Sequence, residues 1–369
     1  MAKIALVSDI HLGTRQYGIK ERYEDFLTAF ANFGDSVVGQ HVNAVVIGGD
    51  LFDSPRPDAY SVRFAKKVVK DIKMSGFSGT PVFGIDGNHD LAGGDWLRVI
   101  GVTPFPDMMV TDLCGVRAIG LSYRNGRDLV AAIKEMADCA MKADILVAHF
   151  ALAEMNGGGS ADTGVRELCP LLEKMGVKCV LMGHVHIPEA RKWNGILFVN
   201  PGSTEMKSAN EPKEKFYFIV DTDTWTAVEV PLETRKMETV EIASEDDLLA
   251  FQTRLSEECK HRSEKPNMVV RTFYQVIADD SIEDAFKRLA KIVHDTGALA
   301  RIVMRSSRAR DVAPVVDRAE SVATLESAIE ARFPKESQEA RLTASFLHSP
   351  EPAAIHLIVD KFMHGEKVT

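Results

Sequence analysis

The sequence predicts an α/β chain with a large layered domain and a smaller α+β domain after it. Short β-branched runs alternate with helical patterns through the first two-thirds of the chain, which is typical of layered α/β domains. The pattern changes near residues 232–238. A length of 369 residues is more than one small compact domain needs. With 45% apolar and 26% charged residues, the chain can build a substantial core.

The first domain is predicted from hydrophobic periodicity. One helix carries Tyr23, Phe26, Leu27 and Phe30 on a single face. Strands are expected at residues 4–7, 43–47, 81–85, 116–120, 145–147 and 177–182, and helices at residues 22–33, 59–74 and 129–141. Short strands and turn residues between residues 190 and 230 predict hairpins that close the sheets of this domain.

The second domain is predicted from a β-α-β-α-β pattern. Strands are expected at residues 239–242, 268–276 and 300–304, with helices at residues 246–258 and 282–293. We therefore predict three segments: residues 1–232, 233–314 and 315–369. The last segment reads as short amphipathic helices with two apolar faces. These faces comprise Val322, Leu325, Ile329 and Phe333, and Ile355, Ile358 and Phe362.

The net charge and the cysteine content argue against some classes of function. A net charge of −9 argues against a strong stand-alone nucleic-acid binder, although bound cations or a partner can supply positive surface. The five cysteines are scattered and never spaced as C-x-x-C, which favours a reducing cytoplasm and argues against a zinc knuckle. We expect a cytoplasmic protein without a membrane span, because no run approaches about 20 apolar residues and the N-terminus lacks a signal-peptide layout.

Five polar clusters stand where predicted strands end. They are Asp9-Ile10-His11, Gly49-Asp50-Leu51-Phe52-Asp53, Gly87-Asn88-His89-Asp90, Ala148-His149-Phe150 and Gly183-His184-Val185-His186. Taken singly, each is more often a turn, a strand end or a buried core histidine. Because open α/β sheets place their sites at the carboxyl edge, their joint occurrence predicts a two-metal site. Alternate residues of an extended segment share a face, so His184 and His186 can serve adjacent metals.

These residues as a set resemble the calcineurin-like metallophosphoesterase superfamily over roughly residues 1–230. The resemblance implies a layered β-sandwich flanked by helices and a two-metal phosphoesterase site. It assigns Asp9, His11 and His186 to the first metal and Asn88, His149 and His184 to the second, with Asp50 bridging both. Two cations about 3.5–4 Å apart activate water and neutralise charge on a phosphate.

The resemblance also implies two catalytic residues that bind no metal. His89 is expected to protonate the leaving oxygen. Asp53 matches the carboxylate that orients this histidine. For Asp90, a local turn cap and a role in the site are both open.

A finer resemblance points to the nuclease subunit of SbcCD-type DNA break-processing complexes. Asp9-Ile10-His11-Leu12-Gly13, then Gln16, Arg22 and Asp25-Phe26, and Pro57 after the Asp50 cluster carry it. It implies a Mn²⁺-dependent DNA nuclease with 3′→5′ exonuclease and single-strand endonuclease activity, acting in DNA repair and recombination. Its expected partners are DNA and an SMC-like coiled-coil ATPase, with the chain as a homodimer within a heterotetramer. Aspartate at position 53, where archaeal and eukaryotic members tend to carry histidine, favours the bacterial or phage branch, the latter working in its host's cytoplasm.

Two rival functions remain open from the sequence. One is a phosphodiesterase for a small substrate such as a cyclic nucleotide. The other is a catalytically silent scaffold for the ATPase, against which the complete ligand set speaks. The resemblance also implies that residues 315–369 dock on the coiled coil of the ATPase; the alternative is that their apolar faces fold back as core.

Two further features have alternative interpretations. Arg301, Arg305, Arg308 and Arg310 either hold DNA phosphates or form a solvated strand end and loop. The glycine run at residues 157–159 is either a substrate-contacting loop or a plain surface loop.

Overall fold

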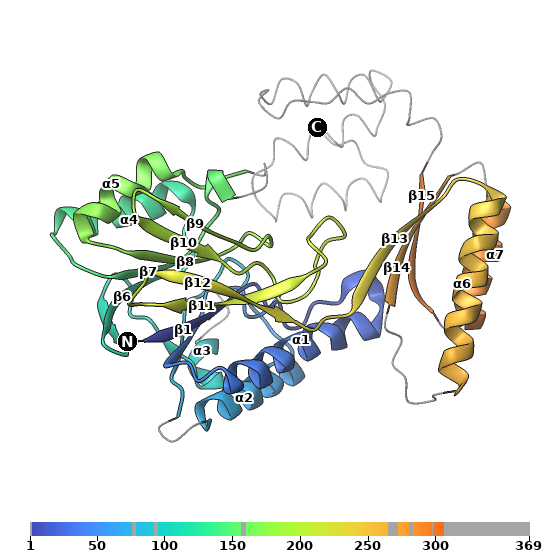
Figure 1. Ribbon diagram of the computed structural model, residues 1–369, viewed down its shortest axis with the longest axis horizontal. Helices are drawn as coiled ribbons and strands as arrows, with labels where there is room; N and C mark the ends of the chain where they lie inside the picture. Colours follow the sequence, from blue (N-terminus) through green and yellow to red (C-terminus); the bar gives the residue numbers. More distant parts are fainter. Residues whose placement is uncertain are drawn as a thin grey trace, which may run out of the picture. The chain divides into compact units, whose positions relative to one another are not determined.

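The structure is a computed structural model that describes residues 2–75, 79–91, 95–155, 160–264, 272–279, 283–296 and 298–305. Within these ranges the strands form three sheets. Two of them have six strands each and lie within residues 3–232, which we call the first domain, and the third has three strands and lies within residues 236–305, which we call the second domain; both belong to one compact unit, Met1–Arg305 (Figure 1).

The first sheet combines a parallel centre with an antiparallel hairpin. Its order is β12 (Thr226–Leu232), β11 (Lys215–Asp221), β1 (Lys3–Val7), β2 (Ala44–Ile47), β3 (Val82–Gly84) and β4 (Thr103–Pro104). Strands β1 to β4 pair in parallel, whereas β11 pairs antiparallel with both β1 and β12.

The second sheet also has a parallel centre, but its antiparallel strands lie at both edges. Its order is β5 (Val110–Leu113), β6 (Val116–Leu121), β7 (Ile145–His149), β8 (Cys179–Gly183), β10 (Ile196–Asn200) and β9 (Glu189–Trp193). The central strands β6, β7, β8 and β10 are parallel, and β5 and β9 pair antiparallel at the two edges. The hairpins β9–β10 and β11–β12 confirm the prediction for residues 190–230.

Helices cover the outer face of each sheet (Figure 1). Beside the first sheet lie α1 (Lys20–Gly39), α2 (Ala59–Lys73) and α3 (Trp96–Ile100); beside the second lie α4 (Gly126–Asp138) and α5 (Val165–Met175). Two 3₁₀ turns, η1 (Gln16–Gly18) and η2 (Ala153–Met155), precede α1 and α5. Helix α2 begins where it does because the carboxylate of Asp58 accepts the N–H groups of Tyr60 and Ser61 at 3.0 Å.

The alternation of side chains along buried strands explains the layers. In β1, Ala5 and Val7 face the helices, whereas Ile4 and Leu6 lie in the core between the two sheets. Both faces of the strand are therefore buried, as expected for a parallel sheet covered by helices. The predicted fold class, a layered sandwich of two sheets flanked by helices, is confirmed.

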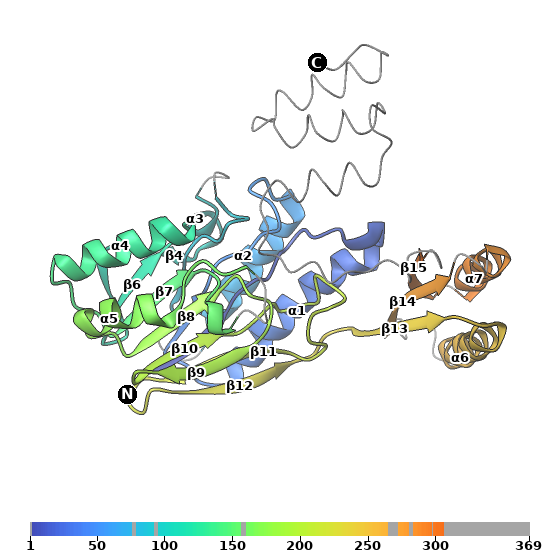
Figure 2. The same cartoon turned by 90° about the horizontal axis from the view of Figure 1, so that it is seen from above.

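The second domain follows the predicted β-α-β-α-β order. Strands β13 (Lys236–Ile242), β14 (Thr272–Asp279) and β15 (Leu299–Arg305) are parallel, with β14 in the centre. Helices α6 (Glu245–Glu264) and α7 (Glu283–Thr296) lie side by side against one face of this sheet (Figure 2). On its other face, Phe273 packs with Met206 and with Tyr17 of η1.

Some predictions fall outside the described residues. These are the C-terminal helical faces, Arg308, Arg310 and the glycine run at residues 157–159. The segment boundaries at residues 232 and 314 stay predictions. Among the described residues, no helix combines the length and apolarity that crossing a membrane requires.

Candidate functional site

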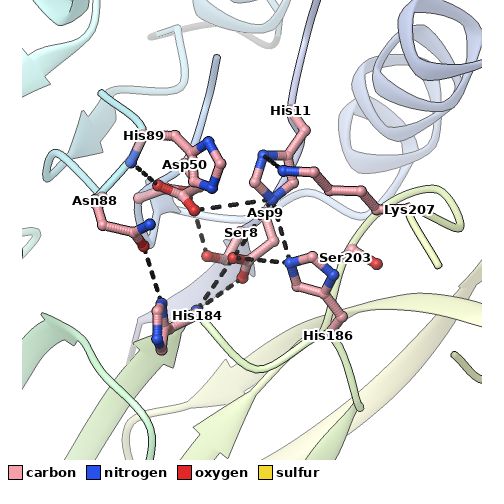
Figure 3. Close-up of polar contacts among 12 residues, drawn as sticks. Ser8, Asp9, His11, Asp50, Asn88, His89, His184, His186, Ser203 and Lys207 are labelled. Carbon is pink, nitrogen blue, oxygen red and sulfur yellow. Dashed lines mark hydrogen bonds and ion pairs between the residues drawn. The ribbon is translucent and has the colours of Figure 1, made fainter. Parts of the chain in front are cut away.

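The five predicted clusters meet at the carboxyl ends of the central parallel strands. Asp9, Asp50 and Asn88 follow β1, β2 and β3 of one sheet. His149 ends β7, and His184 follows β8 of the other. Because neighbouring parallel strands of each sheet end at the same edge and the two sheets pack face to face, residues as far apart in the sequence as Asp9 and His186 converge on one place (Figure 3).

One half of the site is formed by Asp9, His11 and His186. The Nε2 atoms of His11 and His186 lie 3.2 Å apart. Asp9 Oδ1 is 4.0 Å from the first of these nitrogens and 3.7 Å from the second. Asp9 and His11 are buried. These three residues place one donor atom each within 4.8 Å of one another, as a metal site requires.

The other half is formed by Asn88, His149 and His184. Asn88 Oδ1 lies 3.2 Å from His149 Nε2 and 2.9 Å from His184 Nδ1. Asp50 stands between the two halves, because its Oδ2 lies 3.4 Å from His149 Nε2 and 3.8 Å from His11 Nε2. Nitrogen and oxygen donors without a thiolate fit a divalent cation of the Mn²⁺ or Zn²⁺ kind.

The backbone at these strand ends is held in rare conformations. Asp9, His11, Asp50 and His184 all have positive φ values, between 50° and 88°. Such residues cost of order 1–3 kcal/mol each and cluster at functional sites. The fold therefore holds these residues in unfavourable backbone conformations that direct their donor atoms toward one centre.

Close approach explains the glycine before Asn88. A Cβ at Gly87 would lie 2.1 Å from Asp50 Oδ1 and 2.3 Å from its backbone nitrogen. Only glycine lets the loop after β3 approach the loop after β2 this closely.

The buried carboxylates control protonation of the imidazoles. Burial opposes ionisation of Asp50, but His149 and His11 hold the pKa of its carboxyl below the usual range. Burial likewise opposes the charged form of His149, yet Asp50 and Asp9 raise the pKa of this imidazole to about 9. A cation bound to His149 Nε2 would take the place of a proton that these carboxylates already favour.

His89 and Asp53 contact each other differently from what the sequence predicts. His89 Nδ1 lies 2.9 Å from the backbone carbonyl of Asp53, not from its carboxylate. A carbonyl can only accept, so Nδ1 donates and Nε2 is the nitrogen left for proton transfer. The Asp53 carboxylate instead lies 3.5 Å from His11 Nδ1 and 2.7 Å from Lys207 Nζ.

His89 also lies close enough to the donors to be weighed as a ligand. With His11 and Asp50 it forms a third group of donor atoms within 4.8 Å. Its ring meets that of His11 edge-on at 4.9 Å between centroids. Proximity alone does not separate a ligand from a proton donor.

Asp90 does more than cap its own turn. Its carboxylate accepts the N–H groups of Leu51 at 3.1 Å, Phe52 at 2.9 Å and Gly87 at 3.1 Å. Burial raises the pKa of this carboxyl to about 7, against the effect of these donors. Asp90 therefore ties the loop that carries Asn88 and His89 to the loop that carries Asp50.

A carboxylate that the sequence analysis missed supports His186. Glu211 Oε1 lies 2.8 Å from His186 Nδ1, and its Oε2 accepts from Lys215 Nζ at 2.7 Å and Ser203 Oγ at 2.9 Å. Burial disfavours the charge on Glu211, but His186 and Lys215 lower its pKa to about 2. A carboxylate on the outer nitrogen is the usual partner of a metal-binding histidine, because it fixes the ring and its tautomer.

The motif residues Gln16, Arg22 and Asp25 form a buried cluster outside the donor groups. Arg22 is fully buried and donates to Gln16 Oε1 at 2.9 Å, Asp25 Oδ2 at 2.7 Å and the carbonyl of Met206 at 2.8 Å. Arg235, just before β13, also binds Asp25 through two hydrogen bonds. This cluster connects α1, the loop after β10 and the start of the second domain.

Of the predicted basic stretch, the side chain of Arg301 is described. Its guanidinium lies over the ring of Tyr17, 4.3 Å from the centroid. Tyr17 in turn stacks on Phe273 at 5.4 Å between centroids. Arg301 therefore takes part in the contact between η1 and the second domain.

Comparison with known proteins agrees with this geometry. The family model for the calcineurin-like phosphoesterases matches residues 2–188. That range covers half of the chain and includes every predicted site residue. The chain therefore belongs to the calcineurin-like phosphoesterase family, whose members are metal-dependent hydrolases.

Individual relatives show which members of the family the chain is similar to. The "DNA double-strand break repair protein Mre11" of Haloferax volcanii is 29% identical over 256 residues, which are 66% of this chain and 55% of that protein. The protein of the same name from Methanosarcina mazei is 27% identical over 334 residues, 85% of this chain and 51% of that protein. An "Uncharacterized metallophosphoesterase YhaO" of Bacillus subtilis is 25% identical over 58% of this chain and 55% of its own length. The chain spans about half the length of these relatives.

Proposed function

We propose that the chain is a Mn²⁺-dependent DNA nuclease that hydrolyses phosphodiester bonds with two metals, as a 3′→5′ exonuclease and single-strand endonuclease. The observation that carries the proposal is the convergence of six donor side chains around a seventh, Asp50, with His89 beside them. The names of the relatives support DNA as the substrate and repair as the process.

The proposed metal sites follow the two halves of the centre. Asp9, His11 and His186 would hold the first ion, and Asn88, His149 and His184 the second, with Asp50 shared. Bound divalent ions supply Lewis acidity and an activated water at neutral pH. The chain itself fixes the donors, through the Asp90 and Glu211 hydrogen bonds, before any ion arrives.

His89 is the proposed proton donor to the leaving oxygen. The Asp53 carbonyl accepts its Nδ1–H at 2.9 Å, which orients the ring and leaves Nε2 as the second site of protonation. In the imidazolium form both nitrogens carry protons, so Nε2 can deliver one while Nδ1 keeps its hydrogen bond. Asp53 thus acts on His89 through its backbone, and its carboxylate is left for His11 and Lys207.

The proposed partner is an SMC-like coiled-coil ATPase, bound through residues 315–369, with two copies of the chain in a heterotetramer. The net charge of −9 supports a partner that contributes basic surface, because affinity for DNA comes mainly from Lys and Arg on phosphates. Deletion from Val315 onward should abolish co-purification with that ATPase. It should spare Mn²⁺-dependent cleavage of bis-p-nitrophenyl phosphate. An unfolded truncation, or one that still binds the ATPase, would assign these residues to the core.

The test of the function is cleavage of end-labelled single- and double-stranded DNA by the purified chain in Mn²⁺ and in EDTA, with and without the ATPase. An Asp50→Asn variant is the control for contaminating nucleases. Mn²⁺-dependent shortening of DNA supports the proposal. Hydrolysis of cyclic nucleotides with intact DNA would favour the small-substrate enzyme. Binding to the ATPase without any hydrolysis would favour a scaffold.

A further inference from the structure

Lys207 stands at the rim of the site, although it belongs to none of the donor groups. It lies in the loop between β10 and β11, and its side chain reaches back to His11 (Figure 3). Its Nζ is 2.7 Å from Asp53 Oδ1 and 3.1 Å from His11 Nδ1. The side chain is 24% exposed. A cation in contact with solvent therefore lies beside the metal-binding residues.

The backbone of Lys207 is held on both sides. Gln16 Nε2 donates to its carbonyl at 2.7 Å, and its own N–H donates to Glu211 Oε2 at 3.2 Å. The preceding carbonyl, of Met206, accepts from the buried Arg22. Gln16 and Arg22 belong to the sequence motif that the metal site leaves unused. Their observed contacts fix the segment that carries Lys207.

The ammonium group has hydrogen-bonding capacity to spare. His11 directs Nε2 toward Asp9, Asp50 and His186. A neutral imidazole that offers the Nε2 lone pair to a cation carries its proton on Nδ1, so Nδ1 then cannot accept from Lys207. Lysine has three N–H donors, and its contacts with Asp53 and His11 use at most two of them, so at least one is left for a ligand even when no cation is bound.

The pair with Asp53 leaves the ammonium available to a ligand. The two side chains are 24% and 28% exposed, so a phosphate oxygen can reach the ammonium while its contact with Asp53 is kept. The ring of His11 separates Lys207 from the metal-facing nitrogens, because Nζ contacts Nδ1 and the donors cluster at Nε2. A phosphate held at the metals would thus lie on the other side of this ring.

We propose that Lys207 binds a non-bridging oxygen of the nucleic-acid phosphate next to the scissile one, a role that rests on the proposed nuclease function. Lys207 then favours a polynucleotide over a small phosphodiester, because only a polynucleotide has a second phosphate to offer. Gln16 and Arg22 are positioning residues that hold its backbone in place.

The test compares Lys207→Ala and Lys207→Arg with the wild-type chain. Lys213→Ala is the matched control, since Lys213 is exposed on the same loop. Binding of a labelled single-stranded oligonucleotide is followed by fluorescence anisotropy in EDTA at several salt concentrations. Lys207→Ala should weaken binding about tenfold and reduce the slope of log K against log salt by about 0.7. Lys207→Arg should restore most of both, and Lys213→Ala should change neither.

Two further measurements distinguish phosphate binding by Lys207 from a structural role of this residue and from a failure of the proposed nuclease function. In Mn²⁺, Lys207→Ala should raise the KM for the oligonucleotide by a larger factor than the KM for bis-p-nitrophenyl phosphate. A wild-type salt slope combined with weaker Mn²⁺ binding would overturn the inference and make Lys207 a counter-ion of Asp53. Wild-type chain that hydrolyses the small diester but neither binds nor cuts the oligonucleotide would refute the nuclease function itself.

Discussion

Replacing Glu211 with glutamine should weaken metal binding without touching a proposed ligand. Glu211 lies 2.8 Å from His186 Nδ1, the nitrogen that faces away from the other donors. Glutamine keeps the size and one acceptor but loses the charge that makes the imidazole a stronger donor. Loss of such a partner typically lowers metal affinity by about 10- to 100-fold.

The same change should also destabilise the metal-free fold. Glu211 is the counter-charge of Lys215, whose side chain is 1% exposed. The pKa of Glu211 falls from its ordinary 4.5 to about 2 in the folded chain, which corresponds to about 3 kcal/mol. An unpaired buried charge of this kind costs about 3–5 kcal/mol. We therefore expect the free energy of unfolding in EDTA to fall by about 3 kcal/mol.

A double variant separates the two effects. Adding Lys215→Met to Glu211→Gln removes the unpaired charge, so stability should recover while Mn²⁺ affinity stays low. Titration calorimetry with Mn²⁺ and urea unfolding in EDTA measure the two quantities, with Glu214→Gln, exposed on the same loop, as control. Mn²⁺ affinity equal to wild type in Glu211→Gln would refute the reasoning.

The difference in stability between wild type and Glu211→Gln should depend on pH in a direction that the pKa values of the groups at this site determine. Because folding lowers the pKa of Glu211 to about 2, its contribution is fully present above about pH 4.5 and is lost as the pH falls toward 2. Against the effect of burial, Glu211 also helps to raise the pKa of His186, so the stability gap between wild type and Glu211→Gln should be widest near pH 5–6 and should shrink above about pH 6.5, as His186 loses its proton. It should also narrow in more acidic solution.

Three other substitutions test the centre itself. Asp50→Ala should lose metal at both sites, and unchanged Mn²⁺ content would remove it as the bridge. His89→Asn should cut turnover by about 10²–10⁴-fold with Mn²⁺ content retained, whereas loss of an ion would make His89 a ligand. Gly87→Ala should disrupt metal binding, since its new Cβ would meet Asp50 Oδ1 at 2.1 Å. Gly39→Ala, with no atom within 4 Å of the new Cβ, should bind Mn²⁺ like the wild type.

The strands were predictable because their burial leaves a pattern in the sequence. Runs such as residues 4–7 and 44–47 are apolar on both faces, since one face meets helices and the other meets the second sheet. Helix α5 was not predicted. It contains Pro170, which lacks the N–H for the helical bond and usually ends a helix. Pro170 lies on the exposed side, where the ring meets no neighbouring core.

The proposed ligands were predictable from the sequence, whereas the residues that support them were not. Each ligand cluster lies at or near a strand end, so parallel pairing within each sheet and the packing of the two sheets bring them together. Glu211 and Lys207 lie in a loop that consists mainly of lysine, glutamate, serine and proline, which reads as a solvated turn. Only the tertiary arrangement brings that loop back to His186 and His11. The contact of His89 with a backbone carbonyl likewise leaves no trace in residue types.

The two-metal centre is tested most directly by locating the ions. Crystals grown with Mn²⁺ should give two anomalous-scattering peaks per chain, about 3.5–4 Å apart, one on each side of the Asp50 carboxylate. His11 and His186 should contact the first ion, and His149 and His184 the second. A single peak, or two peaks that do not share Asp50, would contradict the account.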